Sequence, residues 1–219
     1  MKIKNAVIMA AGRGMRMMPL TDIVPKAMIP YKGSTLIANG IDKIRKHIEH
    51  IYITVGYKGA LLAQHVIEHN VTGIFNTEGK DNAWWLFNTL LKELDEPVFV
   101  LTCDNVIELN FDLLAHEYYE LGEPACMVVP VTPVSGLDGD YIFGADNIIN
   151  KLTRAEKSNI YCSGIQVLNP AKINRLVDRC DNFYKVWQQL ITLQELYYSN
   201  TYPSEWYAVD TVEQLQRLK

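Results

Sequence analysis

Short apolar runs alternate with helical repeats through the first half of the chain. Residues 5–10 (NAVIMA) form a continuous apolar run, which is typical of a strand buried on both faces. Further on, apolar residues recur at 36, 37, 41, 44 and 48, which is helical spacing. The pattern predicts strands at 5–10, 51–55, 73–76 and 98–102, and helices at 36–48, 59–69, 83–94 and 111–121. This alternation indicates an α/β fold in which helices cover both faces of a parallel sheet.

The pattern changes after Pro124. Strands become more frequent, and the regular alternation with helices is lost. We predict strands at 125–131, 141–143, 148–152, 160–168 and 206–209, and helices at 170–179, 184–198 and 211–218. The chain has no obvious linker, so residues 1–219 are expected to form a single domain with a mixed second half.

Composition narrows the class of protein. The chain has 219 residues, of which 48% are hydrophobic and 21% charged, with a net charge of −4. These values are close to the average for soluble globular domains and argue against a disordered or collagen-like chain. A net negative charge also argues against non-specific binding to nucleic acids or membrane surfaces, which requires a basic surface. We therefore expect neither as a partner.

The cysteines and apolar runs bear on the cellular compartment. Four widely spaced cysteines without CxxC spacing favour reduced, mostly buried thiols over a disulfide framework or a zinc site. The first apolar segment is too short for a signal peptide, and no apolar run approaches the length of about 18 residues that a membrane span needs. We expect a cytoplasmic protein.

Residues 10–28 (AAGRGMRMMPLTDIVPKAM) combine a glycine-rich turn with three basic side chains. Arg13, Arg16 and Lys26 lie near two glycines that directly follow the first predicted strand. Cations this close repel one another unless an anion lies between them, and arginine binds phosphate oxygens with its planar fork. The segment matches neither the P-loop nor the complete GxGxxG pattern. An ordinary strand-to-helix turn is the alternative, and the basic residues favour an anion-binding loop.

Two aspartates each follow a predicted strand. Asp104 comes after residues 98–102, and Asp210 after residues 206–209. A carboxylate at the end of a buried strand is costly unless a cation or a hydrogen-bond donor meets it. Mg²⁺ takes one or two carboxylates together with substrate phosphates. A turn or helix-cap role is the alternative for both, and it is the stronger alternative for Asp210.

The glycine-rich segment resembles the signature of the nucleotidyltransferases that make nucleotide sugars from an NTP and a sugar 1-phosphate. Related members include the phosphocholine cytidylyltransferases. The family pattern is a strand, GxGxRM/L, Pro-Leu-Thr and then Pro-Lys-Pro/Ala. It is matched here by Gly12, Gly14, Arg16, Pro19, Leu20, Thr21, Pro25, Lys26 and Ala27. The resemblance implies a Rossmann-like, three-layer α/β/α fold with a mostly parallel mixed central sheet, a nucleotide-binding half at 1–123 and an acceptor-binding half at 124–219.

The resemblance also implies roles for single residues. Arg16 stabilises the leaving pyrophosphate, Lys26 contacts the phosphates at the reacting centre, and Mg²⁺ lies between Asp104 and Asp210. Asp104 joins Arg16 and Lys26 as the implied catalytic set. The implied nucleotide-binding residues are Ala10, Ala11, Gly12, Arg13, Gly14, Met15, Asn76, Asp81 and Asn82.

Residues 81–86 (DNAWWL) depart from the Gly-Thr-rich segment that sugar-nucleotide members usually carry. They look more like the Asn-aromatic segment of the phosphocholine-type enzymes, which leaves the acceptor open. Helix capping by Asp81 or Asn82 and a core position for the tryptophans are the alternatives. The acceptor-binding residues that we infer are Lys157, Arg154, Tyr141 and Trp84, with a solvated charge cluster as the alternative for the first two.

The expected reaction is an in-line attack by an acceptor phosphate on the α-phosphorus of an NTP, with Mg²⁺ as cofactor and pyrophosphate as leaving group. The main hypothesis is that the acceptor is a sugar 1-phosphate. The alternatives are a CTP-dependent cytidylyltransferase acting on phosphocholine or another small phosphorylated metabolite, and a nucleotide-sugar-binding module without turnover. The sequence alone does not determine which nucleobase is bound or whether the chain forms a homo-oligomer.

Overall fold

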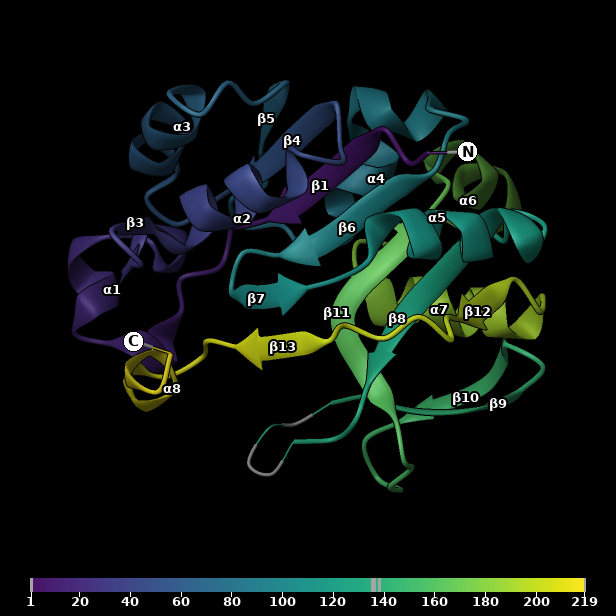
Figure 1. Ribbon diagram of the computed structural model, residues 1–219. Coiled ribbons are helices and arrows are strands. Elements are labelled where there is room, and N and C mark those ends of the chain that lie inside the picture. The colour runs from purple at the N-terminus through teal and green to yellow at the C-terminus, as the bar shows by residue number, and fades with distance from the viewer. Residues whose placement is uncertain (1, 135–136, 138, 219) are drawn as a thin grey trace.

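A nine-stranded mixed sheet forms the centre of the molecule (Figure 1). The structure is a computed structural model that describes residues 2–134, 137 and 139–218. Across the sheet, the strands of this described part follow the order β5 (Gly73–Asn76), β4 (His50–Val55), β1 (Asn5–Met9), β6 (Val98–Thr102), β11 (Tyr161–Leu168), β8 (Cys126–Val131), β12 (Leu196–Tyr198), β10 (Ile148–Thr153) and β9 (Tyr141–Ala145).

The parallel part of the sheet places the glycine-rich loop beside Asp104. Strand β1 pairs in parallel with β4 on one side and β6 on the other, so Met9 lies opposite both Thr54 and Thr102. The loop after β1 and the turn after β6 therefore leave the sheet at the same edge. The two elements therefore lie on one side of the sheet.

Helices cover both faces, which confirms the three-layer arrangement. One hydrophobic core lies under α2 (Leu36–Ile44), α3 (Gly59–Ile67) and α5 (Phe111–Glu120). A second core lies on the opposite face, under α4 (Trp84–Asn88), α6 (Pro170–Leu176) and α7 (Phe183–Thr192). The buried strand residues between them alternate between the two cores: Ile8 belongs to the first and Val7 to the second.

The two halves of the chain share this sheet. Strand β11 runs antiparallel to both β6 and β8, and it inserts between them. The sheet is thus mixed, as expected, and its parallel character is concentrated in the first half. The division at residue 123 into a nucleotide-binding and an acceptor-binding half stays a prediction.

A small ribbon outside the main sheet brings the end of the chain back to the site. Strand β7 (Asn105–Glu108) pairs with β13 (Glu205–Ala208) in antiparallel fashion. Helix α8 (Val212–Gln216) follows and lies beside the N-terminal segment that carries α1 (Leu20–Ile23), as Figure 1 shows. A third core joins Met17 and Ile29 to Val209 and Leu215, which fixes this contact.

Several predicted elements were wrong in extent. The helix expected at 83–94 breaks at Thr89, whose hydroxyl donates to the Trp85 carbonyl and accepts from Leu91 N–H, giving α4 and a short 3₁₀ helix, η3 (Leu90–Glu93). The helix expected at 184–198 ends at Thr192, because Gln194 has a left-handed backbone (φ 58°) and β12 follows. The helix expected at 170–179 ends at residue 176. Sequence reasoning missed the hairpin β2 (Pro30–Tyr31) and β3 (Ser34–Thr35) as well as β7 and β12.

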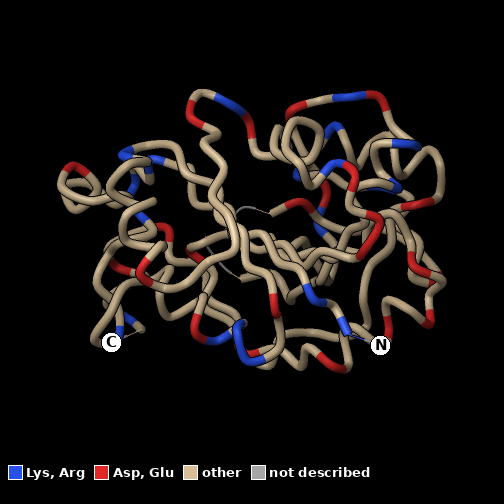
Figure 2. Tube along the Cα trace, turned by 90° about the horizontal axis from the view of Figure 1, so that it is seen from above, with Lys and Arg blue, Asp and Glu red and all other residues tan. Residues whose placement is uncertain are grey.

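Charged residues are interspersed along the chain. Figure 2 shows Lys and Arg alternating in space with Asp and Glu around the periphery. Within the residues that the structure describes, each helix is too short or too polar to traverse a bilayer.

Candidate active site

The glycine-rich loop is tied to the sheet before it turns. The Ala10 N–H donates to the Thr54 carbonyl (3.1 Å) and lies 3.2 Å from the Thr54 hydroxyl. The Ala11 carbonyl accepts from the Tyr57 N–H at 3.0 Å. These bonds fix the backbone on both sides of the strand end, so the residues from Gly12 onward project from a rigid base.

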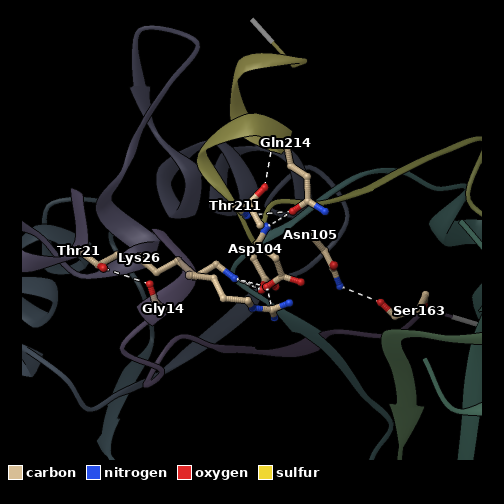
Figure 3. A network of polar contacts seen from close by, with 10 residues as sticks. Gly14, Thr21, Lys26, Asp104, Asn105, Ser163, Thr211 and Gln214 are labelled. Carbon is tan, nitrogen blue, oxygen red and sulfur yellow. Dashed lines mark hydrogen bonds and ion pairs between the residues drawn. The ribbon is translucent and has the colours of Figure 1, made fainter. Parts of the chain in front are cut away.

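Gly14 is required by the local geometry of this loop. Its φ of 68° lies in the left-handed region, and a Cβ there would lie 2.8 Å from Lys26 Cβ. The buried Thr21 hydroxyl donates to the Gly14 carbonyl at 3.0 Å (Figure 3). The loop therefore folds back against the short 3₁₀ helix η2 (Lys26–Met28) and holds the stem of Lys26.

Lys26 lies between the two aspartates that the sequence singled out. Its Nζ donates to Asp104 Oδ2 at 2.5 Å and to Asp210 Oδ1 at 2.7 Å (Figure 3). Arg16 Nη2 also contacts Asp210 Oδ1, at 3.0 Å. Burial alone would lower the pKa of Lys26, but the carboxylates of Asp104 and then Asp210 outweigh this and raise the pKa above its ordinary value. The structure thus assembles Arg16, Lys26, Asp104 and Asp210 into one charged cluster, defined here as the ion-pair cluster.

The β7–β13 ribbon positions the aspartates of the ion-pair cluster. Asp104 follows β6, and its carbonyl accepts from the Val209 N–H at 3.0 Å. Asp210 follows β13, while Thr211 rather than Asp210 caps α8, in a capping box with Gln214. Helix capping is therefore not the role of the Asp210 carboxylate, which points to Lys26 instead.

The ion-pair cluster lines a cleft of about 520 Å³. Arg13 and Gly14 also line this cleft, and the Arg13 guanidinium lies over the Tyr57 ring and 3.7 Å from Asp22. Further lining residues are Thr77, Lys80, Asp81, Asn82 and Trp85. The cleft therefore combines basic side chains with uncharged groups, which suits an anion with an uncharged body.

Most of the predicted nucleotide-binding residues reach this cleft. Those at its surface are Ala11, Gly12, Arg13, Gly14, Met15, Asp81 and Asn82. Ala10 is buried beneath the loop, and Asn76 is exposed with its side-chain oxygen accepting from Glu78 N–H, so Thr77 rather than Asn76 lines the cleft. The binding roles of all these residues stay predictions.

Asp81 and Asn82 join two distant segments. Asp81 Oδ2 accepts from the Asn182 side chain at 2.8 Å, and Asn82 Oδ1 accepts from the Phe183 N–H at 2.9 Å. Neither caps α4, whose N-cap is Ala83. Their carboxylate and amide oxygens thus hold the cleft wall to the start of α7.

Trp84, which was expected to bind the acceptor, lines neither this cleft nor the smaller cavity that adjoins it, and its acceptor role stays a prediction. Trp84 is half-buried, with the Lys80 ammonium 5.9 Å from its ring centre, and Trp85 lines the cleft instead. Trp85 packs against Phe183, and within the described part of the chain its Nε1 has no hydrogen-bond partner. A helical turn of adjacent tryptophans does not reveal from sequence which ring faces inward.

A second cavity, of about 210 Å³, adjoins the first and shares Thr102, Asp104 and Asp210 with it. Its wall includes three aromatic residues, Tyr161, Trp187 and Trp206. The Trp206 Nε1–H and the Asn105 side chain both donate to the Ser163 carbonyl at 3.1 Å, where a bulge interrupts β11. The bulge thus fixes this wall next to the ion-pair cluster.

The predicted acceptor residues are only partly at this second cavity. Arg154 lines it and forms a bidentate pair with Asp140, at 2.9 and 3.1 Å. Lys157 is exposed outside the lining, and Tyr141 lies behind Tyr161 in an edge-to-face ring contact at 5.8 Å. The sequence did not predict the lining residues Tyr161 and Trp206. They come together through the packing of β11 against β13, and this long-range contact leaves no periodic signal in the sequence.

Cys103 lines the first cleft, where its surroundings disfavour the thiolate form. Burial raises the pKa of its thiol to about 12, so the reactive thiolate is scarce at neutral pH.

Comparison with known proteins places this geometry in a family. The family model described as "Nucleotidyl transferase" matches residues 5–209. The chain belongs to the nucleotidyl transferase family. The match spans the loop after β1 as well as β13, so it includes the whole nine-stranded sheet and the lining residues of both cavities except Asp210.

Individual relatives agree with this assignment. The chain is similar to the bifunctional protein GlmU of Methanococcus maripaludis, with 31% identity over 75% of this chain and 40% of the relative. It is also similar to a mannose-1-phosphate guanyltransferase of Debaryomyces hansenii, with 25% identity over 88% of this chain and 58% of the relative. The chain thus spans less than two thirds of the length of these relatives.

Solved structures confirm the fold. The CTP:phosphocholine cytidylyltransferase of Streptococcus pneumoniae superimposes with a TM-score of 0.77 at 21% identity, covering 100% of this chain and 98% of that one. A putative glucose-1-phosphate thymidylyltransferase of Bacillus anthracis superimposes with a TM-score of 0.80 at 16% identity, covering 98% and 93%.

Proposed function

We propose that this protein transfers a nucleoside monophosphate from an NTP to a sugar 1-phosphate and releases pyrophosphate, with Mg²⁺ as cofactor. The observation that carries the proposal is the position of Lys26. Its ammonium contacts Asp104 and Asp210 where the basic cleft meets the second cavity. A donor phosphate chain in the first cavity and an acceptor phosphate in the second would meet at this point.

The residues present fit a magnesium ion. The oxygens Asp104 Oδ2 and Asp210 Oδ1 converge on a single cation, the Lys26 ammonium. Mg²⁺ is bound by one or two carboxylates, with phosphate oxygens and waters filling the remaining positions. When bound by Asp104 and Asp210, the ion would neutralise charge on the phosphate undergoing transfer.

The chain's own residues supply positioning and charge. Arg16 and Arg13 are each more than half exposed at the side chain, so their guanidinium groups can reach a triphosphate in the cleft. The stem of Lys26 packs against Gly14 and its ammonium pairs with Asp104, so its charge already lies beside the cleft before substrate binds. The acceptor phosphate is already ionised at neutral pH, and the proposed reaction therefore needs no general base.

The curated relatives favour a sugar 1-phosphate as acceptor. One of them is named as a mannose-1-phosphate guanyltransferase. The aromatic wall of the second cavity is compatible with this acceptor, because sugar rings pack on indole and phenol rings.

The same wall favours a second candidate, a cytidylyltransferase acting on phosphocholine or another small phosphorylated metabolite. Tyr161, Trp187 and Trp206 line the cavity together with the Asp140 carboxylate. Aromatic faces attract quaternary ammonium groups by cation–π interaction, and a carboxylate adds to that attraction. Arg154, which pairs with Asp140, would have to share that carboxylate with the ligand cation.

A matrix of substrates tests the proposal. The purified chain is incubated with Mg²⁺, each of the common NTPs, and either a panel of sugar 1-phosphates or phosphocholine, and pyrophosphate release is measured. Release that needs a sugar 1-phosphate supports the proposal. Release that needs CTP and phosphocholine supports the second candidate. Nucleotide-sugar binding without release from any pair would indicate a binding module and overturn both.

A further inference from the structure

The ion-pair cluster holds a cation where the metal ion would bind. Lys26 Nζ lies 2.5 Å from Asp104 Oδ2 and 2.7 Å from Asp210 Oδ1. Mg²⁺ binds carboxylate oxygens at about 2.0–2.1 Å, so it needs the same oxygens and nearly the same position. The Lys26 side chain is only 10% exposed, which leaves little room for an ion beside it.

The net charge of the ion-pair cluster also disfavours a metal ion in the absence of nucleotide. Arg16 and Lys26 supply two positive charges against the two negative charges of Asp104 and Asp210. The cluster is therefore neutral without a ligand. A free divalent cation would leave it with a large net positive charge, whereas a triphosphate together with the cation would not.

The protein offers few other ligands to strengthen metal binding. Across residues 2–134, 137 and 139–218, no group of three or more His, Cys, Asp or Glu side chains is arranged to hold a metal. Two carboxylates fill only a minority of the octahedral positions of Mg²⁺. The remaining ligands would have to come from phosphate oxygens and water.

We infer that Lys26 blocks the metal position until the triphosphate binds, an inference that rests on the proposed function. In the nucleotide-free protein the ammonium occupies both carboxylates and keeps a divalent cation out. The triphosphate draws Lys26 and Arg16 onto its own oxygens, which frees Asp104 and Asp210 for the metal. Nucleotide and metal therefore bind cooperatively, and each raises the affinity for the other by the same factor.

The test measures metal binding without turnover. Mn²⁺ alone is titrated into the nucleotide-free protein, and free Mn²⁺ is followed by its electron paramagnetic resonance signal. Lys26→Met removes the charge and keeps most of the stem. It is expected to raise the affinity for Mn²⁺ by about 5–150-fold, the range of typical coupling between sites. Lys80→Met removes a charge from the same cleft and is expected to change that affinity less than about 2-fold, because Lys80 contacts the Trp84 ring rather than the aspartates.

Two further arms separate this inference from the proposed function. Adding Asp104→Asn to Lys26→Met should remove the gained Mn²⁺ affinity, which assigns the gain to the two carboxylates. Thermal unfolding shows that each variant is folded. One contrary result is a wild type that releases pyrophosphate with Mg²⁺ while folded Lys26→Met binds Mn²⁺ no more tightly than wild type. That result would overturn the inference that Lys26 blocks the metal position and would leave the proposed function intact. Absence of pyrophosphate release from the wild type with every substrate pair would overturn the function instead.

Discussion

Substitution of Gly14 perturbs the candidate site most directly, because this position requires both a left-handed backbone and the absence of a Cβ. Its backbone is left-handed, and its missing Cβ leaves the space that Lys26 fills: a Cβ would approach Lys26 Cβ to 2.8 Å and Lys26 Cδ to 3.0 Å. Gly14→Ala should therefore strain the backbone and displace the lysine from the aspartates. Gly33→Ala separates the two effects, since Gly33 has a φ of 76° but no other described atom within 4 Å of its added Cβ.

The expected losses in the free energy of unfolding follow from the backbone strain and from the overpacking against Lys26. A left-handed alanine costs about 1–2 kcal/mol, partly offset by about 0.4–1 kcal/mol of reduced unfolded-state entropy. Gly33→Ala should thus lower the free energy of unfolding by about 1 kcal/mol. Gly14→Ala adds the cost of overpacking, about 1–3 kcal/mol, for a total of about 2–4 kcal/mol. In a chain of this size, each kcal/mol lowers Tm by about 2–4 °C.

The two variants should also differ in turnover. A displacement of about 1 Å at a reacting centre can cost about 100-fold in rate, so Gly14→Ala should lower pyrophosphate release by about that factor. Gly33→Ala should keep the wild-type rate, because Gly33 lies at the turn between β2 and β3. Denaturant unfolding and initial-rate assays give both readouts. Wild-type stability and rate in Gly14→Ala, or an equal loss of rate in Gly33→Ala, would refute this account of the loop.

Two further predictions concern Lys26 and Glu117. Lys26→Ala should lower kcat about 100-fold or more while weakening NTP binding much less, because its charge meets the transferring phosphate; a pure binding defect in steady-state and binding assays would contradict this. Glu117 accepts hydrogen bonds from Ser199 Oγ and from the N–H groups of Asn200 and Thr201. Burial would raise the pKa of Glu117, but these bonds outweigh it and lower the pKa below the ordinary value of 4.5. The stabilisation is therefore present above about pH 4.5 and is lost as the pH falls through the lowered pKa. Glu117→Gln should cost about 1–2 kcal/mol at pH 7, and the gap to wild type should narrow at lower pH in denaturant titrations; a gap that widens there would be inconsistent with this origin.

The part of the site around the glycine-rich loop and Asp104 was largely predictable from sequence. The apolar run before Gly12 indicated a buried strand, and the run before Asp104 indicated another. Parallel strands end at one edge of a sheet, and β1 and β6 are direct neighbours, so the loop and Asp104 had to lie close together. The order of glycines and basic residues predicted an anion-binding loop at this edge without knowledge of any distance, and that role stays a prediction.

Other features depend on contacts that sequence patterns do not encode. Residues 196–198 continue the apolar spacing of α7, yet they form a strand because β8 offers a parallel partner. Residue patterns alone gave Asp210 as a strand end with a metal or helix-cap role, and the family resemblance placed it with Asp104 around a metal ion. Its approach to Lys26 depends on the pairing of β13 with β7 outside the main sheet. The second cavity combines residues from β11, α7 and β13, and no local period connects them.

The central claim is that the ion-pair cluster is the centre of nucleotidyl transfer, and Asp104→Asn tests it most directly. The initial rate of pyrophosphate release is measured with Mg²⁺ and the substrate pair that wild type prefers, for wild type, Asp104→Asn and the control Asp112→Asn at the exposed start of α5. We predict a loss of at least about 100-fold for Asp104→Asn, with its thermal midpoint close to that of wild type, and the full rate for Asp112→Asn. Near-normal pyrophosphate release by folded Asp104→Asn would contradict the claim.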